Sequence, residues 1–330
     1  MNHDNDRRTF IKKGLTTAAG IGLLSKAGTI TQAEKLAANI NANTMPKRKL
    51  GKTGYDVSLF GLGGQATIEQ PGKLDESVEI INRALDLGVN YIDTAAWYGG
   101  DWGARGTSEK HIGEVMKHRR NEVFLATKSL PYNRTYSDTL SQFEQSLNNL
   151  QTDYIDLYQV HNVRLQSDLD AIFADGGAME AFDQLKNDGS IGFIGITGHY
   201  DPAILKKAIE QYDFDCILLA LNAADIHQKP FQYDLLDTAV KRNLGIIAMK
   251  IPARGRMFRY DGITSMEQAL RYVYSFPINT AIVGISEIDQ LEENVEITRN
   301  FHKYTKQEMN DIAQLTAHYY EYASWYKTEW

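Results

Sequence analysis

The chain has 330 residues, of which 43% are hydrophobic and 23% charged, so it can bury a sizeable core and general disorder is excluded. This length allows one large domain or two ordinary ones. The single cysteine, Cys216, excludes an intramolecular disulfide, a CxxC redox site and cysteine-ligated iron–sulfur or zinc centres, and no metal site is predicted. The formal net charge of -7 does not favour a nucleic-acid-binding surface.

The N-terminal segment differs in charge from the rest of the chain. Residues 1–32 hold five basic and two acidic side chains, a balance of +3, so the remainder carries -10 rather than -7. The arginine pair Arg7-Arg8 stands just before Phe10, and an uncharged stretch over 14–25 follows. That stretch is too short and too rich in Gly, Ala and Thr to span a bilayer, which takes about 20 apolar residues.

This order of features resembles a twin-arginine (Tat) export signal, with a weak cleavage site at 31–33. We therefore predict a signal peptide over residues 1–33, a polar linker over 34–46 and one domain over 47–330. The resemblance implies a periplasmic or otherwise exported protein that engages the Tat export machinery and has no stable membrane anchor. The Tat route carries folded proteins, often with a cofactor already bound. The alternative is a frayed basic N-terminus with a chance pair of arginines.

Short apolar runs alternate with amphipathic stretches through the rest of the chain. Residues 49–58 predict a small hairpin with its turn at 52–54. Eight runs follow that are short, apolar and bounded by polar residues or glycine, as buried parallel strands are. They lie at 59–63, 91–94, 123–127, 155–160, 193–196, 216–221, 245–248 and 280–283. Between them apolar residues recur at helical spacing, and Asp201-Pro202 predicts the start of one helix.

Eight strand–helix units in about 250 residues match the size of a (β/α)8 TIM barrel, which is an α/β fold. A doubly wound sheet is the competing architecture, but it requires a GxGxxG turn after its first strand. Residues 61–65 read Gly-Leu-Gly-Gly-Gln instead. We therefore predict a barrel preceded by an N-terminal β-hairpin, with residues 305–330 forming an extra C-terminal helix outside the eight units.

Four polar side chains stand where the predicted strands end. Asp93 and Tyr98 follow the second strand, Lys128 ends the third and His161 follows the fourth. The active site of a TIM barrel forms at the C-terminal ends of its strands, so these side chains are expected to converge. Taken singly, each has a structural explanation, such as a capping aspartate or a buried histidine. A lysine at the mouth of a barrel, however, needs a charged partner, for which Asp93 is the nearest candidate.

The sequence around these four residues resembles the aldo/keto reductase family over about residues 47–300. The matching segments are Asn90 to Ala95, Tyr98-Gly99, Ser108-Glu109, Ile112-Gly113, Thr127-Lys128 and the strand before His161. The resemblance implies that Asp93, Tyr98, Lys128 and His161 form the catalytic tetrad of an NAD(P)-dependent oxidoreductase. Such an enzyme interconverts a carbonyl compound (an aldehyde, a ketone or a sugar) and an alcohol.

The chemistry of these side chains agrees with that role. A carbonyl oxygen develops negative charge as its carbon is reduced, so it needs a positioned proton donor. Tyr98 is predicted to be the general acid and base, and Lys128 to lower the pKa of Tyr98. Asp93 is predicted to hold Lys128, and His161 to orient the carbonyl oxygen.

The resemblance extends to a nicotinamide cofactor, either NADP(H) or NAD(H). Residues 282–294 are similar to the family's phosphate-binding segment, in which a strand leads into a helix whose N-terminus faces the phosphates. The alternative for this segment is an ordinary exposed helix. The candidate cofactor-binding residues are Thr197, Asn222, Met249, Lys250, Gly284, Ser286, Gln290, Glu293 and Asn294.

The last predicted unit departs from the pattern of NADP-dependent relatives, which usually carry Lys or Arg there to neutralise the 2′-phosphate. This chain has Ile285 and Gln290 at those positions, with the acidic Glu287 beside them. Lys250 and two arginines at 254 and 256 follow the seventh strand and could supply the charge from another loop. The choice between NAD(H) and NADP(H) therefore stays open.

Three further positions depart from the family. Thr197 stands where Ser is common, Asn222 where Gln is common, and Met249 where a stacking aromatic is common. Methionine can still pack against a ring. These changes indicate a divergent branch.

The substrate pocket has three candidate wall residues, Trp97, Trp102 and Asn162. The last twelve residues hold six aromatic side chains, which either shape the pocket, as the C-terminal segment does in the family, or pack a helix on the barrel wall. We expect the second arrangement. Cys216 is expected to be a buried structural residue, because no matched motif involves it.

Three functions are compatible with the sequence. The first is an exported carbonyl reductase or alcohol dehydrogenase. The second is an exported enzyme that keeps NAD(H) tightly bound and recycles it while acting on a sugar, an alternative motivated by the predicted export. The third is a non-catalytic barrel, which the complete tetrad disfavours.

Overall fold

The computed structural model describes residues 44–99 and 104–328. The predicted signal peptide and almost all of the predicted linker lie outside the described residues, and so do Trp102 and Trp330. The first strand of the described chain is β1 (Lys47–Lys49), and Met45 just before it already belongs to the apolar core. In the described part of the chain, no helix is both long and apolar enough to cross a membrane.

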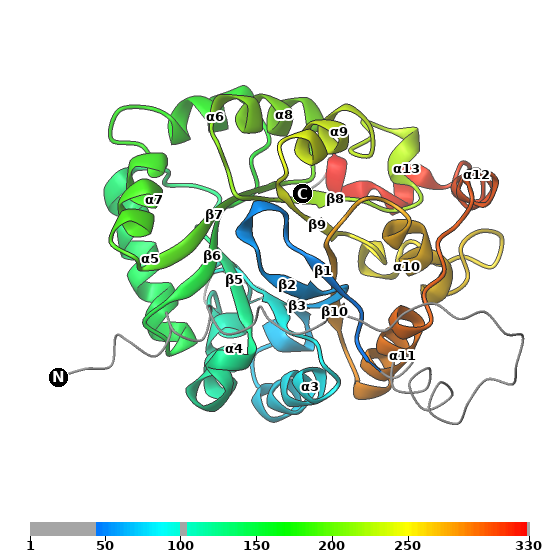
Figure 1. Ribbon diagram of the computed structural model, residues 1–330, viewed down its shortest axis with the longest axis horizontal. Helices are drawn as coiled ribbons and strands as arrows, with labels where there is room; N and C mark the ends of the chain where they lie inside the picture. The colour runs from blue at the N-terminus through cyan, green and yellow to red at the C-terminus, as the bar shows by residue number, and fades with distance from the viewer. Residues whose placement is uncertain (1–43, 100–103, 329–330) are drawn as a thin grey trace, which may run out of the picture. The chain divides into compact units, whose positions relative to one another are not determined.

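The chain forms a closed barrel of eight parallel strands, which confirms the predicted (β/α)8 fold (Figure 1). The order around the barrel is β10-β3-β4-β5-β6-β7-β8-β9, so each strand pairs with its neighbours in sequence and the last closes on the first. Each of the eight predicted runs overlaps one strand. The strands are β3 (Phe60–Ala66), β4 (Tyr91–Asp93), β5 (Phe124–Lys128), β6 (Ile155–Val160), β7 (Ile191–Gly198), β8 (Cys216–Ala220), β9 (Gly245–Met249) and β10 (Thr280–Ile285).

Helices surround the barrel and cover the outer face of its strands (Figure 1). Asp201 begins one of them as predicted, because its side chain accepts a hydrogen bond from the backbone N–H of Ala203 and Pro202 follows as the first residue of the helix. The helices are α3 (Leu74–Asp86), α4 (Thr107–Arg119), α5 (Tyr136–Leu150), α6 (Gln166–Ile172), α7 (Ala178–Asn187), α8 (Pro202–Gln211), α9 (Asp234–Lys241), α10 (Met266–Tyr274) and α11 (Ile288–Arg299).

The barrel interior is a separate apolar cluster, distinct from the larger cluster between strands and helices. Inward-facing residues such as Tyr91 and Phe124 fill it together with Cys216. The predicted hairpin, formed by β1 and β2 (Asp56–Ser58), adds Leu50 and Val57 to this cluster and so closes the N-terminal end of the barrel. Burial raises the pKa of the Cys216 thiol, in agreement with a structural role.

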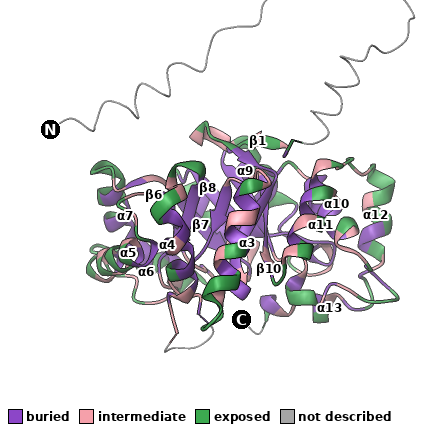
Figure 2. Cartoon of the chain, turned by 90° about the horizontal axis from the view of Figure 1, so that it is seen from below, coloured by how far each residue is buried: buried purple, intermediate pink, exposed green. Residues whose placement is uncertain are grey.

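The predicted extra C-terminal helix is present as α12 (Lys306–Gln314), but the residues after it do not continue as a helix. They form a short α13 (Tyr320–Ala323) and a 3-10 turn over Trp325–Lys327. The buried Thr316 donates its hydroxyl to Ala223 O at 3.0 Å, and the Tyr319 hydroxyl donates to Met257 O at 2.9 Å. These bonds to the β8 and β9 loops redirect the chain, and α13 lies at the opposite end of the barrel from the hairpin (Figure 2).

Candidate active site

The four predicted catalytic side chains lie at the C-terminal ends of three neighbouring strands. Asp93 ends β4, Lys128 ends β5, and His161 directly follows β6, while Tyr98 stands on the loop after β4. Parallel pairing sets Asp93 opposite Ala126 and Lys128 opposite residue 159. The barrel therefore brings the four together where its chemistry is expected.

Lys128 and Asp93 form a buried ion pair, and each side chain is only 1% exposed. Lys128 Nζ donates to Asp93 Oδ1 and, at 2.6 Å, to Thr94 O. Burial raises the pKa of Asp93 and lowers that of Lys128, and their mutual attraction opposes both shifts. Gln159 Nε2 donates to the second carboxylate oxygen of Asp93 at 3.0 Å, a contact that the sequence analysis missed.

Tyr98 lies against this ion pair, with Lys128 Nζ 5.0 Å from the centre of its ring. The pKa of Tyr98 is raised above its ordinary value, first by burial and then by the negative charges of Asp93 and Glu69. This is opposite to the predicted lowering by Lys128, because burial and the two nearby carboxylates outweigh the positive charge of the lysine. Tyr98 therefore stays a protonated phenol at neutral pH.

His161 faces Tyr98 edge-on, with 6.2 Å between ring centres. Burial, and then the positive charge of Lys128, lowers the pKa of His161 well below its ordinary value, so the imidazole is neutral and carries one N–H donor. Arg134 Nη2 donates to His161 O at 3.1 Å and to Asn162 O at 3.3 Å. This side chain fixes the loop that carries the histidine.

A cavity of about 820 Å³ extends from Tyr98 along the β3, β9 and β10 loops. Its volume lies in the range of small-molecule and cofactor sites, about 300–1,000 Å³. Seven of the nine predicted cofactor-binding residues line it: Met249, Lys250, Gly284, Ser286, Gln290, Glu293 and Asn294.

The walls of this cavity fit a dinucleotide. Gly64 and Gly284 line it, and a Cβ at Gly64 would stand 2.5 Å from Ser108 Oγ, so glycine there allows β3 to pack closely against the neighbouring chain. Ser286 and Gln290 place the N-terminus of α11 at the cavity, where backbone N–H groups and the helix dipole suit phosphate. These residues would hold the phosphates of a nicotinamide dinucleotide.

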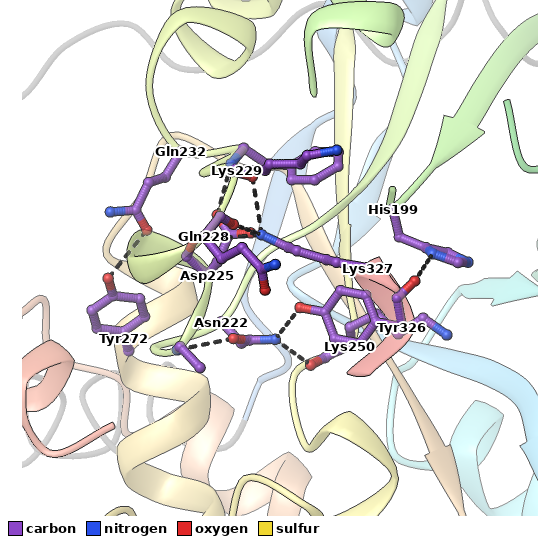
Figure 3. Close-up of polar contacts among 12 residues, drawn as sticks. His199, Asn222, Asp225, Gln228, Lys229, Gln232, Lys250, Tyr272, Tyr326 and Lys327 are labelled. Carbon is purple, nitrogen blue, oxygen red and sulfur yellow. Dashed lines mark hydrogen bonds and ion pairs between the residues drawn. The ribbon is translucent and has the colours of Figure 1, made fainter. Parts of the chain in front are cut away.

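Two predicted cofactor-binding residues lie elsewhere. Thr197 lines a second, smaller cavity of about 360 Å³. Asn222 lines neither of the two cavities, because its amide is committed to the protein (Figure 3). Its Nδ2 donates to Lys250 O at 2.9 Å and to the Tyr326 hydroxyl at 2.8 Å, and its Oδ1 accepts from Ala224 N at 3.0 Å. Asn222 therefore links the β8 and β9 loops to the C-terminal segment, and its contact with the cofactor stays a prediction.

The C-terminal segment contacts residues of this site, whereas packing on the barrel wall was the arrangement expected from the sequence. Tyr326 is fully buried, and its carbonyl oxygen lies 3.1 Å from His199 Nδ1 (Figure 3). The next residue, Lys327, forms a buried ion pair with Asp225 and also donates to Gln228 O at 2.5 Å. The only available signals were the cluster of aromatic residues near the end of the sequence and a lysine within it.

The smaller cavity meets the larger one at Tyr98, Met249 and Lys250, which line both. The predicted wall residues Trp97 and Asn162 line the smaller cavity, while Trp102 lies outside the described residues. Among the residues that the structure describes, no group of three or more His, Cys, Asp or Glu side chains is arranged to hold a metal ion. A barrel with a tyrosine, a neutral histidine and a Lys–Asp pair between two cavities has the features of a barrel oxidoreductase.

Comparison with known proteins agrees with this class. The model of the aldo/keto reductase family matches residues 59–262. L-galactose dehydrogenase of Arabidopsis thaliana is 33% identical over 291 residues, which cover 75% of this chain and 86% of that protein. The holo form of aldo-keto reductase AKR11C1 from Bacillus halodurans is 25% identical, with a TM-score of 0.70 over 82% of this chain and 96% of that one.

A third likeness concerns the fold alone. An aldo-keto reductase from Klebsiella pneumoniae, solved in complex with NADPH, has a TM-score of 0.67 at 20% identity and covers 83% of this chain and 96% of that one. The chain belongs to the aldo/keto reductase family. It is an NAD(P)-dependent oxidoreductase that interconverts carbonyl compounds and alcohols.

Proposed function

We propose that this chain reduces or forms a small carbonyl compound at the junction of its two cavities, with Tyr98 as the general acid and base. The observation that carries the proposal is the position of Tyr98, which lines both cavities and lies against the buried Lys128–Asp93 pair. A bound nicotinamide dinucleotide supplies or accepts the hydride. The protein's own residues supply the proton and the alignment.

Each side chain has a distinct part in this proposal. The Tyr98 phenol donates its proton to the carbonyl oxygen as negative charge develops there. The neutral imidazole of His161 donates a hydrogen bond to the same oxygen and orients it. Lys128, held by Asp93, places a positive charge at the Tyr98 ring and stabilises the phenolate that proton donation leaves behind.

We propose that NAD(H) binds more tightly than NADP(H). The stretch 282–294 carries no Lys or Arg, and Gln290 uses its side-chain oxygen to accept a hydrogen bond from Ser286 N at 3.1 Å. Arg254 also lines the large cavity, but its guanidinium lies 3.3 Å from the Glu69 carboxylate. The binding constants of NADH and NADPH, measured by fluorescence titration, test this proposal, and tighter binding of NADPH would contradict it.

We also propose export through the Tat route, which the order of Arg7-Arg8, Phe10 and the uncharged stretch over 14–25 supports. Replacing both arginines with lysine is expected to retain the protein in the cytoplasm, as measured by cell fractionation. Unchanged export of the variant would contradict the proposal.

Export motivates a second candidate, in which the protein carries its NAD(H) with it and recycles it on a sugar. Acid release of small molecules from the purified exported protein, followed by mass spectrometry, separates the two candidates. Stoichiometric NAD(H) would favour the second candidate. An empty protein that oxidises added NADH with aldehydes supports the exchangeable reductase, and a protein that binds no dinucleotide would contradict both.

A further inference from the structure

The smaller cavity is rich in basic side chains, although the chain as a whole has a net charge of -7. Among the described residues, a single carboxylate lines it, that of Asp168. The charged and titratable side chains at its wall, apart from Tyr98, are Lys128, His161, Arg164, Asp168, His199 and Lys250.

Most of these charges are neutralised within the protein. The positive charge of Lys128 is matched by Asp93. The carboxylate of Asp168 lies 3.5 Å from Arg134 Nη2 and also accepts a hydrogen bond at 2.8 Å from the backbone N–H of Arg164. The Lys128–Asp93 and Arg134–Asp168 ion pairs therefore attract a substrate anion only weakly.

Arg164 is different. Within the described residues its guanidinium forms no ion pair, and its buried Nε has no hydrogen-bond partner. It stacks on the ring of Tyr200, with Cζ 4.8 Å from the ring centre, which holds the side chain without neutralising it. Burial lowers the pKa of Lys250 on the same wall, which leaves Arg164, among the described residues, as the cation available to a substrate anion.

The loop that carries Arg164 is held by the side chain of Arg134. Arg134, whose side chain is 7% exposed, holds the carbonyl groups of His161 and Asn162 and pairs with Asp168 at the far end of the loop. His161 and Arg164 are three residues apart, so their Cα atoms are separated by at most about 10 Å. One short loop thus presents a carbonyl-orienting group and a cation to the same small cavity.

We propose that Arg164 binds a carboxylate on the substrate whose carbonyl group is held by Tyr98 and His161. The substrate is then a small aldehyde or keto acid, or the corresponding hydroxy acid. A guanidinium matches a carboxylate through two parallel hydrogen bonds, and a cavity of about 360 Å³ accommodates a compound of this size. This inference rests on the proposed function for the position of the carbonyl group.

The test compares two aldehydes of equal chain length, succinic semialdehyde and butanal, in NADH-dependent reduction. The wild-type protein is expected to prefer the carboxylate substrate in kcat/KM, and Arg164→Gln to lower that preference by about tenfold or more. Arg164→Lys should retain part of it. The matched control Arg242→Gln, whose side chain lies near the N-terminal end of β9 and pairs with Asp213, should leave it unchanged. An equal preference in wild type and Arg164→Gln would overturn the proposal.

Two further arms remove the remaining ambiguity. The first arm compares glyceraldehyde phosphate with glyceraldehyde as substrates. If Arg164→Gln lowers the preference for the phosphate substrate but not the preference for succinic semialdehyde over butanal, the carboxylate assignment is wrong. Calorimetric binding of γ-hydroxybutyrate to the protein without cofactor does not depend on turnover. Binding that is lost in Arg164→Gln and kept in Arg242→Gln supports the anion site even if neither aldehyde reacts. The failure of both aldehydes to react would contradict only the proposed function. No binding to the wild type would overturn the anion site itself.

Discussion

Asn222 Nδ2 donates a hydrogen bond to the hydroxyl of Tyr326 at 2.8 Å, across 104 residues of chain. Through the same amide nitrogen, Asn222 also donates to Lys250 O. The C-terminal segment is thereby linked to the β9 loop, which lines both cavities. We expect that loss of this contact at the end of the chain weakens cofactor binding.

Replacing Tyr326 with phenylalanine tests the link. The variant loses one buried hydrogen bond, so its free energy of unfolding is expected to fall by about 1 kcal/mol in denaturant titration. The dissociation constant of the cofactor is expected to rise severalfold, because the β9 loop is less well held. Tyr212→Phe is the control, since its hydroxyl bonds to Asp183 on α7 and neither residue lines the two cavities. Equal cofactor affinities in all three proteins would contradict the link.

The buried pair of Lys327 and Asp225 predicts a large effect on stability. Both side chains are 0% exposed, so Lys327→Met leaves an unpaired buried carboxylate and is expected to cost about 3–5 kcal/mol. Adding Asp225→Asn should restore part of this loss, since the remaining charge is removed. Chemical denaturation of the two variants measures both effects. A single variant as stable as the wild type would show that the pair does not hold the C-terminal segment.

Cofactor choice is predicted to depend on the start of α11. Gln290→Arg places a cation at the large cavity and is expected to lower the dissociation constant of NADPH by about tenfold, with little change for NADH. Gln307→Arg, on the exposed α12, adds the same charge far from the cavity and serves as the control. NADPH affinity that rises equally in both variants would indicate a general charge effect.

The pH dependence follows from the direction of two pKa shifts. The pKa of Tyr98 is raised above its ordinary value of about 10, so the proton donor is present throughout neutral pH. The pKa of His161 is lowered below about 6.5, so its charge does not change there. At saturating cofactor, carbonyl reduction is expected to be flat between about pH 7 and 9. Alcohol oxidation, which needs the phenolate, should rise about tenfold per pH unit.

A stopped-flow measurement of both directions, with the cofactor prebound, checks these slopes. A fall in the reduction rate with a midpoint near neutrality would mean that Tyr98 loses its proton there, contrary to the raised pKa. A flat oxidation rate would mean that the phenolate is not the base.

The barrel and the tetrad were predictable for the same reason. Buried parallel strands leave short apolar runs, and the run at 155–160 matches β6 (Ile155–Val160) residue for residue. Once the strands are placed, their C-terminal ends must meet, which brings Asp93, Lys128 and His161 together. The position of α11 at the large cavity follows equally from the order of the units.

Other features depend on contacts that no local pattern encodes. The burial of Tyr326 and Lys327 depends on side-chain bonds that redirect the chain after α12. The raised pKa of Tyr98 depends on burial and on how far Asp93 offsets the charge of Lys128, and the sequence does not reveal that balance. The sequence likewise does not show that Arg164 forms no ion pair with the described residues, because this depends on which side chains the fold places around it.

The central claim is that Tyr98 donates the proton to the carbonyl oxygen. Its most direct test is single-turnover reduction of an aldehyde by Tyr98→Phe with NADH prebound. The control is Tyr158→Phe, which alters a fully buried tyrosine of β6 that packs against Phe182 on the outer side of the strand. Tyr98→Phe is expected to bind NADH normally and to reduce the aldehyde about 10²–10⁴-fold more slowly, while the control keeps its rate. Full single-turnover activity of Tyr98→Phe would contradict this claim.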